Sequence, residues 1–163
     1  MQILDYAMQM ELDGEKYYRE LATTCQDAGI RGILERMANA EVKHYNTLKQ
    51  MKDSGAGEMD ADVVRPEAKN LFREMMDSGA TFDFNVAELS LYEKARDVEF
   101  KTRDFYLEHA EEVVSDDAKA LFKRLADEEA LHANIISSII EFVEHAEPGH
   151  WVEDAEWYTK EVY

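Results

Sequence analysis

The two halves of the chain repeat one another at a constant offset of 88 residues. The shift needs no gap, and it superimposes aromatic, basic and acidic positions alike. The aligned sets are Tyr17-Tyr18 with Phe105-Tyr106, Arg36-Met37-Ala38 with Arg124-Leu125-Ala126, and Glu11, Glu41 and His44 with Glu99, Glu129 and His132. Several coincidences at one offset favour a duplicated structural unit over convergence. The fold must therefore accommodate the same unit twice.

The repeated unit is predicted to be a pair of helices. Apolar residues recur at three- and four-residue steps in each half, and only 7 Gly and 2 Pro interrupt the 163 residues. A short break at 27–29 makes the first two helices an antiparallel hairpin, whereas the halves are joined by a long crossover. We predict an all-α four-helix bundle over residues 1–146. Its segments are helices 3–26 and 30–52 (hairpin 3–52), the crossover 53–85, and helices 86–114 and 117–145 (hairpin 86–145).

Two segments lie outside this pattern. Within the crossover, Pro66 can open a short helix that reaches about Met76, since proline is tolerated in a first turn. In the tail, 147–163, Trp151 and Trp157 stand among acidic residues. We expect this tail to dock on its own bundle or on a partner subunit, and a frayed tail is the alternative.

The polar residues that the repeat aligns fall on apolar helix stripes. Glu41 and His44 are three residues apart and project from one helix face. Glutamate is costly to bury there unless it is paired, protonated or bound to a metal. Four carboxylates and two imidazoles suit two iron or manganese ions, with a Glu-His pair on each and bridging carboxylates from the partner helices. Zinc could occupy such a site but would do no redox chemistry. The predicted ligands are Glu11, Glu41, His44, Glu99, Glu129 and His132. The alternative is that these carboxylates pair with one another or reach solvent.

The charge and the cysteine content exclude several classes of function. A net charge of −18 repels phosphate backbones and anionic lipid, which argues against nucleic-acid and membrane-surface roles. A single cysteine excludes an internal disulfide framework and any Cys-x-x-Cys site. Charges interrupt every apolar stretch before it reaches the length of a membrane helix. We therefore expect a soluble cytoplasmic protein.

The sequence resembles the rubrerythrin branch of the ferritin-like superfamily over nearly its whole length. The matching pattern is Met10-Glu11-x-x-Gly14-Glu-x-Tyr17-Tyr18-x-x-Leu21-Ala22, then Ala40-Glu41-x-x-His44, then Glu99 and Glu129-x-x-His132. The resemblance implies a ferritin-like di-iron carboxylate bundle, usually a homodimer or larger oligomer. Such proteins reduce hydrogen peroxide, or oxidise ferrous iron with oxygen or peroxide. The resemblance also implies the same six ligands, with Glu41 and Glu129 as the bridges.

The chain departs from the rubrerythrin pattern at two points. Full-length rubrerythrins carry a rubredoxin-like centre with paired Cys-x-x-Cys motifs that feeds electrons to the di-iron site, and Cys25 alone cannot form it. Electrons are therefore expected from an external donor, such as a rubredoxin-like protein. Thr102 stands where rubrerythrins place a further glutamate, and Gly14 is its repeat partner. We accordingly expect a symmetric set of six ligands.

Two tyrosines, a cysteine and a histidine also have side chains that could serve a metal or redox site. Tyr18 and Tyr106 each lie seven residues after a predicted ligand glutamate. They could orient a ligand carboxylate or carry a proton or electron, or they could be core aromatics with satisfied hydroxyls. Cys25 is predicted to be a buried small hydrophobe rather than a redox group. His109 lies off the Glu99 face and is not predicted to be a ligand.

The leading hypothesis is a di-iron oxidoreductase that reduces hydrogen peroxide, or oxygen, with electrons from the external carrier. One alternative is a ferroxidase or iron-handling protein, which would need a closed multi-subunit shell. Another is a helical interaction module that is free of metal or binds zinc.

Overall fold

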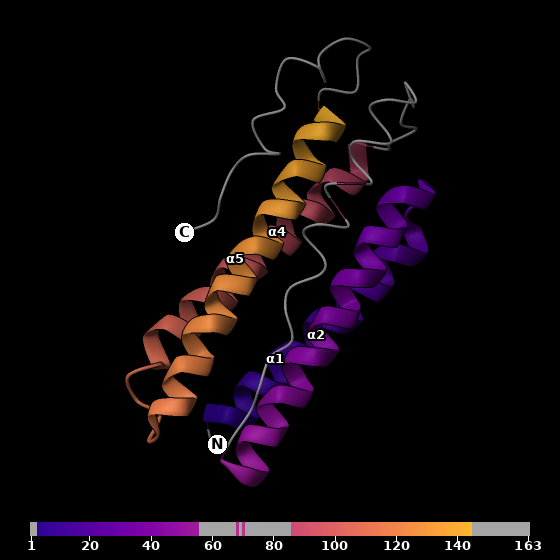
Figure 1. Cartoon of the computed structure of the whole chain (residues 1–163). Coiled ribbons are helices and arrows are strands. Elements are labelled where there is room, and N and C mark those ends of the chain that lie inside the picture. Colours follow the sequence, from indigo (N-terminus) through magenta and orange to yellow (C-terminus); the bar gives the residue numbers. More distant parts are fainter. Residues whose placement is uncertain (1–2, 56–67, 69, 71–85, 145–163) are drawn as a thin grey trace.

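The computed structural model of the chain describes residues 3–55, 68, 70 and 86–144. Long helices make up nearly all of this part, and they pack as two pairs (Figure 1). The helices are α1 (Ile3–Thr24), α2 (Ala28–Ser54), α4 (Val86–His109) and α5 (Asp116–Glu144). The predicted all-α bundle of two helical hairpins is confirmed.

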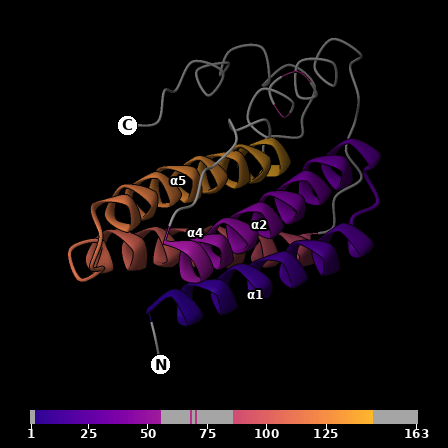
Figure 2. The same ribbon diagram turned by 60° about the horizontal axis from the view of Figure 1, so that its bottom comes forward.

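The two hairpins lie side by side, and each is an antiparallel pair. α1 packs along α2, α4 packs along α5, and the hairpins meet through α1 with α4 and α2 with α5 (Figure 2). The turn between α1 and α2 and the turn between α4 and α5 lie at opposite ends of the bundle (Figure 1). α2 therefore ends at one end of the bundle and α4 begins at the other. A helix as long as α2 spans roughly 40 Å, so the connection between the hairpins must cover about that distance.

Capping residues set the ends of α2. The Asp27 side chain accepts a hydrogen bond from the Ile30 amide at 2.9 Å, and Ala28 and Gly29 consequently lie in the first turn. The break is 25–27 rather than the predicted 27–29, because α1 ends at Thr24 instead of residue 26 and α2 begins at Ala28. At the other end Gly55 adopts a φ of 75°, and its amide bonds to the Met51 carbonyl at 2.8 Å. Glycine takes this left-handed conformation without the steric cost of a side chain.

The turn between α4 and α5 begins earlier than predicted. α4 ends at His109 rather than at residue 114, and the Glu112 amide bonds back to the His109 carbonyl at 3.0 Å, a tighter turn than an α-helix. The β-branched pair Val113-Val114 has low helix propensity, which favours the early end. Ser115 then caps α5, because its Oγ accepts a hydrogen bond from the Ala118 amide at 3.1 Å.

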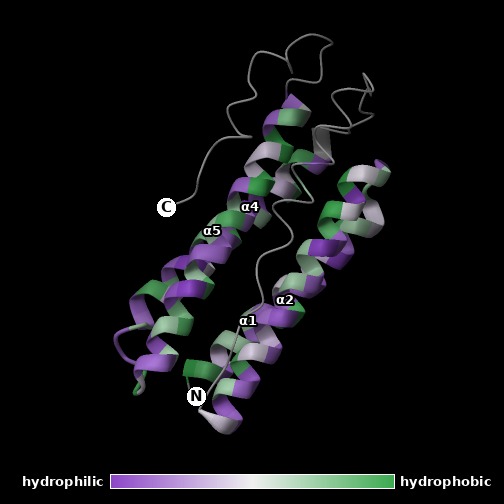
Figure 3. Cartoon of the chain, in the orientation of Figure 1, coloured by the Kyte–Doolittle hydropathy of each residue, from purple (hydrophilic) through white to green (hydrophobic). Residues whose placement is uncertain are grey.

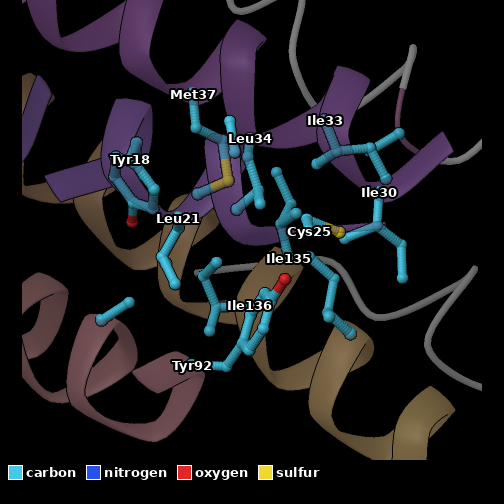
Figure 4. Packing of buried hydrophobic residues seen from close by; sticks show 14 of the residues in the cluster. Tyr18, Leu21, Cys25, Ile30, Ile33, Leu34, Met37, Tyr92, Ile135 and Ile136 are labelled. Carbon is cyan, nitrogen blue, oxygen red and sulfur yellow. The ribbon is translucent and has the colours of Figure 1, made fainter. Parts of the chain in front are cut away.

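The core consists of two apolar clusters with a layer of polar side chains between them. On α5, Leu125 belongs to one cluster and Ile136 to the other, and Glu129 and His132 lie between them. Figure 4 shows the cluster nearer the α1–α2 turn, where side chains from all four helices point toward one another. Cys25 lies in this cluster and is 2% exposed, which confirms its predicted burial. The packing of both clusters holds the polar layer at a fixed height in the bundle.

Hydrophilic and hydrophobic residues alternate along each helix (Figure 3). On α4 the buried face differs from the prediction at one position. The four-residue steps from Leu91 to Ala95 and Glu99 predict that Leu91 lies on the buried stripe, but Leu91 is 38% exposed and Tyr92 is buried in its place. Tyr92 and Ala95 are three residues apart, so both face the cluster, and the large ring of Tyr92 fills the space.

No helix in the described part of the chain is long and apolar enough to cross a membrane. The predicted short helix after Pro66 and the predicted docking tail 147–163 fall outside the described residues, apart from positions 68 and 70, which are helical. The boundaries of the crossover stay predictions.

Candidate metal centre

The polar layer brings the six predicted ligand side chains together at the middle of the bundle. α1 supplies Glu11 and α4 supplies Glu99, each from the face turned toward the other helices. α2 and α5 each supply a glutamate and a histidine from one turn. All six residues are at most 4% exposed: Glu11, Glu41, His44, Glu99, Glu129 and His132.

The six side chains form two overlapping groups that could each hold a metal ion. In each group the candidate ligand atoms all lie within 4.8 Å of one another. One group is Glu11, Glu41, His44 and Glu129, and the other is Glu41, Glu99, Glu129 and His132. Glu41 and Glu129 belong to both groups, so each could contribute one oxygen to each of two neighbouring ions. This arrangement favours them as bridges over Glu11 and Glu99.

Both imidazoles turn their Nδ1 atom toward the carboxylates. His44 Nδ1 lies 3.2 Å from Glu129 Oε1 and 3.4 Å from Glu11 Oε2. His132 Nδ1 lies 3.1 Å from Glu41 Oε1 and 3.6 Å from Glu99 Oε1. The two rings stack with 5.6 Å between centroids and 13° between planes. The Nδ1 atoms are thus the imidazole atoms available to a metal pair.

Two tyrosines connect the halves of the layer. Tyr18 of α1 donates its hydroxyl hydrogen bond to Glu99 of α4, and Tyr106 of α4 donates to Glu11 of α1. Burial, and then the charge of the glutamate that each one faces, raises the pKa of both tyrosines well above 10, so the hydroxyls stay protonated donors. Each tyrosine is therefore both a buried core aromatic and a partner of a candidate ligand. The sequence could not show that each bond crosses to the other half.

Without metal, the layer balances its charges internally. Burial alone would raise the pKa of Glu11, but hydrogen bonds and the charge of His44 lower it to about 2. Burial also opposes the ionisation of Glu99, but hydrogen bonds with Glu129 and His132 and the charge of His132 lower its pKa. Burial and the neighbouring carboxylates raise the pKa of Glu41 and Glu129 well above 4.5. Burial opposes the charge on both imidazoles, yet the surrounding carboxylates raise their pKa well above 6.5. These shifts favour carboxylates at Glu11 and Glu99, imidazolium forms of both histidines and protonated carboxyls at Glu41 and Glu129, so that the charges of these six groups balance.

The buried oxygens of Glu129 are suited to binding two metal ions. Neither carboxylate oxygen of Glu129 has a hydrogen-bond partner among the described residues, although both are buried. Such groups are rare in native structures and call for an explanation. Carboxylate and imidazole ligands without a thiolate suit iron or manganese. The donor set present therefore matches a dimetal carboxylate site.

The rubrerythrin family model matches residues 2–140, which include all four helices except the end of α5. The chain belongs to the rubrerythrin family. No curated protein and no solved structure matched the chain. Membership in the rubrerythrin family implies a di-iron site, and the buried Glu and His groups are the residues that could hold it.

The departures from the rubrerythrin pattern are visible in the structure. The Thr102 hydroxyl donates to the Val98 carbonyl of its own helix at 3.0 Å and so does not turn into the cluster. Gly14 lies directly against Glu41, because a Cβ at Gly14 would stand 3.3 Å from Glu41 Oε2. His109 pairs with Glu112 at 2.9 Å, at the end of α4, and does not join the cluster.

Sequence reasoning missed one residue at the centre. Glu128 accepts a hydrogen bond from His44 Nε2 at 2.8 Å and is largely buried. It precedes the predicted ligand Glu129 in an acidic stretch, and such a stretch is typical of a solvated helix face. Its repeat partner is Ala40, so the repeat gave no signal for it.

A cavity of about 430 Å³ leads from the surface between α1 and α4 to the cluster. Its walls are mostly apolar and aromatic and include Met10, Tyr17 and Val98. Glu41, Glu99 and Glu129 also line it, together with Gly14 and Thr102. Small side chains at these last two positions leave the carboxylates accessible from this side.

Metal binding is expected to release about four protons for each pair of divalent ions. Two come from the protonated Glu41 and Glu129, and two from the imidazolium groups of His44 and His132, because metal ligands must be deprotonated. A pH-indicator dye in weak buffer measures the release during a zinc titration at pH 7. The affinity is expected to fall as the pH is lowered. Release of two protons or fewer would show that the carboxyls of Glu41 and Glu129 are already ionised in the metal-free protein.

Proposed function

We propose that the protein reduces hydrogen peroxide, or dioxygen, at a di-iron centre held by these six side chains. Glu11 and His44 would be terminal ligands of one ion, Glu99 and His132 of the other, and Glu41 and Glu129 the bridges. The observation that carries the proposal is that two candidate ligand groups share both of these glutamates within a buried layer. Two adjacent metal positions are what a two-electron reduction needs.

When bound, two ferrous ions supply one electron each, with which H2O2 and two protons give two waters as the O–O bond breaks. The protein contributes position and environment. The apolar clusters on either side keep bulk water away from the layer, which strengthens its electrostatic interactions. Tyr18 and Tyr106 orient Glu99 and Glu11 through their hydroxyl hydrogen bonds.

The centre must be reduced again after each turnover. One cysteine cannot make a four-cysteine iron site, so the proposal includes an electron donor other than these residues, such as a rubredoxin-like protein. A homodimer and a cytoplasmic location are also part of the proposal.

Rapid mixing of the di-ferrous protein with hydrogen peroxide tests the activity. The proposal predicts oxidation of both ions in one fast phase, followed by recovery of the ferrous state when a reduced rubredoxin is added. A parallel experiment with dioxygen ranks the two oxidants. A rate equal to that of ferrous ion free in the same buffer would refute the proposal.

Filling the cavity is expected to slow this reaction. Val98 lines the cavity and is 42% exposed, so Val98→Trp places an indole where the oxidant would pass. We expect the rate constant with peroxide to fall roughly tenfold, which corresponds to a barrier raised by about 1.4 kcal/mol. Leu107→Trp is the matched control, because Leu107 is exposed on the same helix and does not line the cavity. Equal rates in the two variants would mean that the oxidant reaches the cluster by another path.

A further inference from the structure

The two histidines of the metal centre differ in what contacts Nε2, the ring nitrogen that faces away from the candidate metal position. Behind His44, the Nε2 atom is 2.8 Å from Glu128 Oε2, and the Glu128 side chain is only 12% exposed. Glu128 comes from α5, on the same turn as Glu129, and it reaches across to α2. His44 is thus held between the candidate metal position at Nδ1 and a carboxylate at Nε2.

Behind His132 there is no such group in the part of the chain that the structure describes. The Nε2 atom of His132 is buried and lacks a hydrogen-bond partner there. The 88-residue repeat explains the difference. The residue that corresponds to Glu128 is Ala40, whose methyl group is buried and cannot accept a hydrogen bond. All six candidate ligands and both tyrosines obey the repeat, and this position does not.

The difference has a chemical consequence for the imidazoles. An ionised carboxylate only accepts hydrogen bonds, so Glu128 keeps a proton on His44 Nε2 and leaves the Nδ1 lone pair for a metal. A carboxylate partner also makes a ligating imidazole more basic and fixes the orientation of its ring. His132 has neither advantage.

We propose that the two metal positions are inequivalent, and that Glu128 is a positioning residue that makes the His44 position bind the first metal ion and bind it more tightly. The inference rests on the proposed dimetal centre and concerns how it is loaded. Removal of such an imidazole partner lowers metal affinity by about 10- to 100-fold, which sets the expected difference between the positions.

A cobalt(II) titration of the metal-free protein tests the inference without any turnover. Calorimetry gives the affinity of each step. Nuclear magnetic resonance of protein with ¹⁵N-labelled histidine shows which imidazole the first equivalent shifts, with the resonances assigned from the His132→Ala variant. The first ion is expected to shift His44. Charge repulsion between two ions could by itself produce two steps, so the identity of the first imidazole is the deciding result.

A set of variants removes the carboxylate partner of His44 or moves it to His132. Glu128→Ala is expected to weaken the first step about 10- to 100-fold. Ala40→Glu together with Glu128→Ala is expected to move the first ion to the His132 position. Glu128→Gln keeps the shape and a neutral acceptor, and it is expected to lie between the wild type and Glu128→Ala. The control is Glu93→Ala, which removes the same charge from an exposed position on α4.

The outcomes separate this inference from the proposed function. If the first equivalent divides equally between the two imidazoles, or if Glu128→Ala leaves the first step unchanged, the positions are equivalent and the inference is overturned. If the wild type binds no cobalt, the proposed function is overturned with it. Should the double variant fail to fold, Glu128→Ala and Glu128→Gln still decide, because Glu128 lies at the edge of the core.

Discussion

Replacing Glu129 by glutamine is expected to abolish binding of the metal pair and, at the same time, to stabilise the metal-free protein. Glu129 belongs to both candidate groups, so its loss removes a ligand from both positions. Its two oxygens are buried without hydrogen-bond partners among the described residues, and burial and neighbouring carboxylates raise its pKa. Glutamine has the shape of glutamate without the charge. We expect the free energy of unfolding at pH 7 to rise by about 1–3 kcal/mol, because folding of the wild type must protonate Glu129 or bury its charge, and each pH unit above the pKa of the unfolded chain costs about 1.4 kcal/mol.

The two effects are measured on the same sample. Metal content after reconstitution gives the first, and urea unfolding of the metal-free protein gives the second. Glu93→Gln is the control for the change in net charge, because Glu93 is exposed on α4. The gain in stability is expected to grow as the pH rises above the usual carboxyl range. A variant that still binds two ions per chain, or that is destabilised without metal, would contradict a role for Glu129 as a shared ligand.

Metal is expected to reverse the pH dependence of stability between pH 5 and 8. Without metal, Glu41, Glu129 and both imidazoles have a pKa in the folded protein above that in the unfolded chain. The native state then binds more protons than the unfolded state, so stability falls as the pH rises above 4.5 for the carboxyls and 6.5 for the imidazoles. The lowered pKa of Glu11 and Glu99 matters only below 4.5, outside this range.

With metal, the same groups are deprotonated ligands, so the native state binds fewer protons than the unfolded state and stability rises with pH. Each ion at a free concentration a thousandfold above its dissociation constant adds about 4 kcal/mol. Thermal unfolding at several pH values, with zinc and with chelator, measures both curves. A melting temperature that rises from pH 5 to 8 in chelator would contradict the protonation pattern of the polar layer.

The architecture and the polar layer could be predicted because one repeat governs both. The 88-residue offset requires two similar hairpins, and it places Glu41 and Glu129 on equivalent turns. Packing of two such hairpins then brings the equivalent turns face to face. The buried positions of the six side chains follow from this symmetry.

The features that could not be predicted are those that the repeat does not determine. Glu128 becomes visible only when α5 packs on α2, because nothing in the sequence relates it to His44. Leu91 and Tyr92 are adjacent, and both lie near the apolar stripe of α4. Tyr92 is the buried one, because its large ring fills the space inside the bundle. The early end of α4 depended on the tight turn at Glu112, which competes with a helical pattern that continues to residue 114. The donor of each tyrosine hydrogen bond was predictable, but its acceptor on the opposite hairpin was not.

The central claim is that two iron ions in the polar layer act as one two-electron centre. Its most direct test is a titration of the iron-loaded, fully reduced protein with hydrogen peroxide, with iron per chain measured by elemental analysis and oxidation followed by visible absorption. The account predicts two irons per chain and an end point at one peroxide for every two irons, with the absorption of an oxo-bridged ferric pair. Fewer than one iron per chain would contradict it. An end point that differs from one peroxide for every two irons would also contradict it.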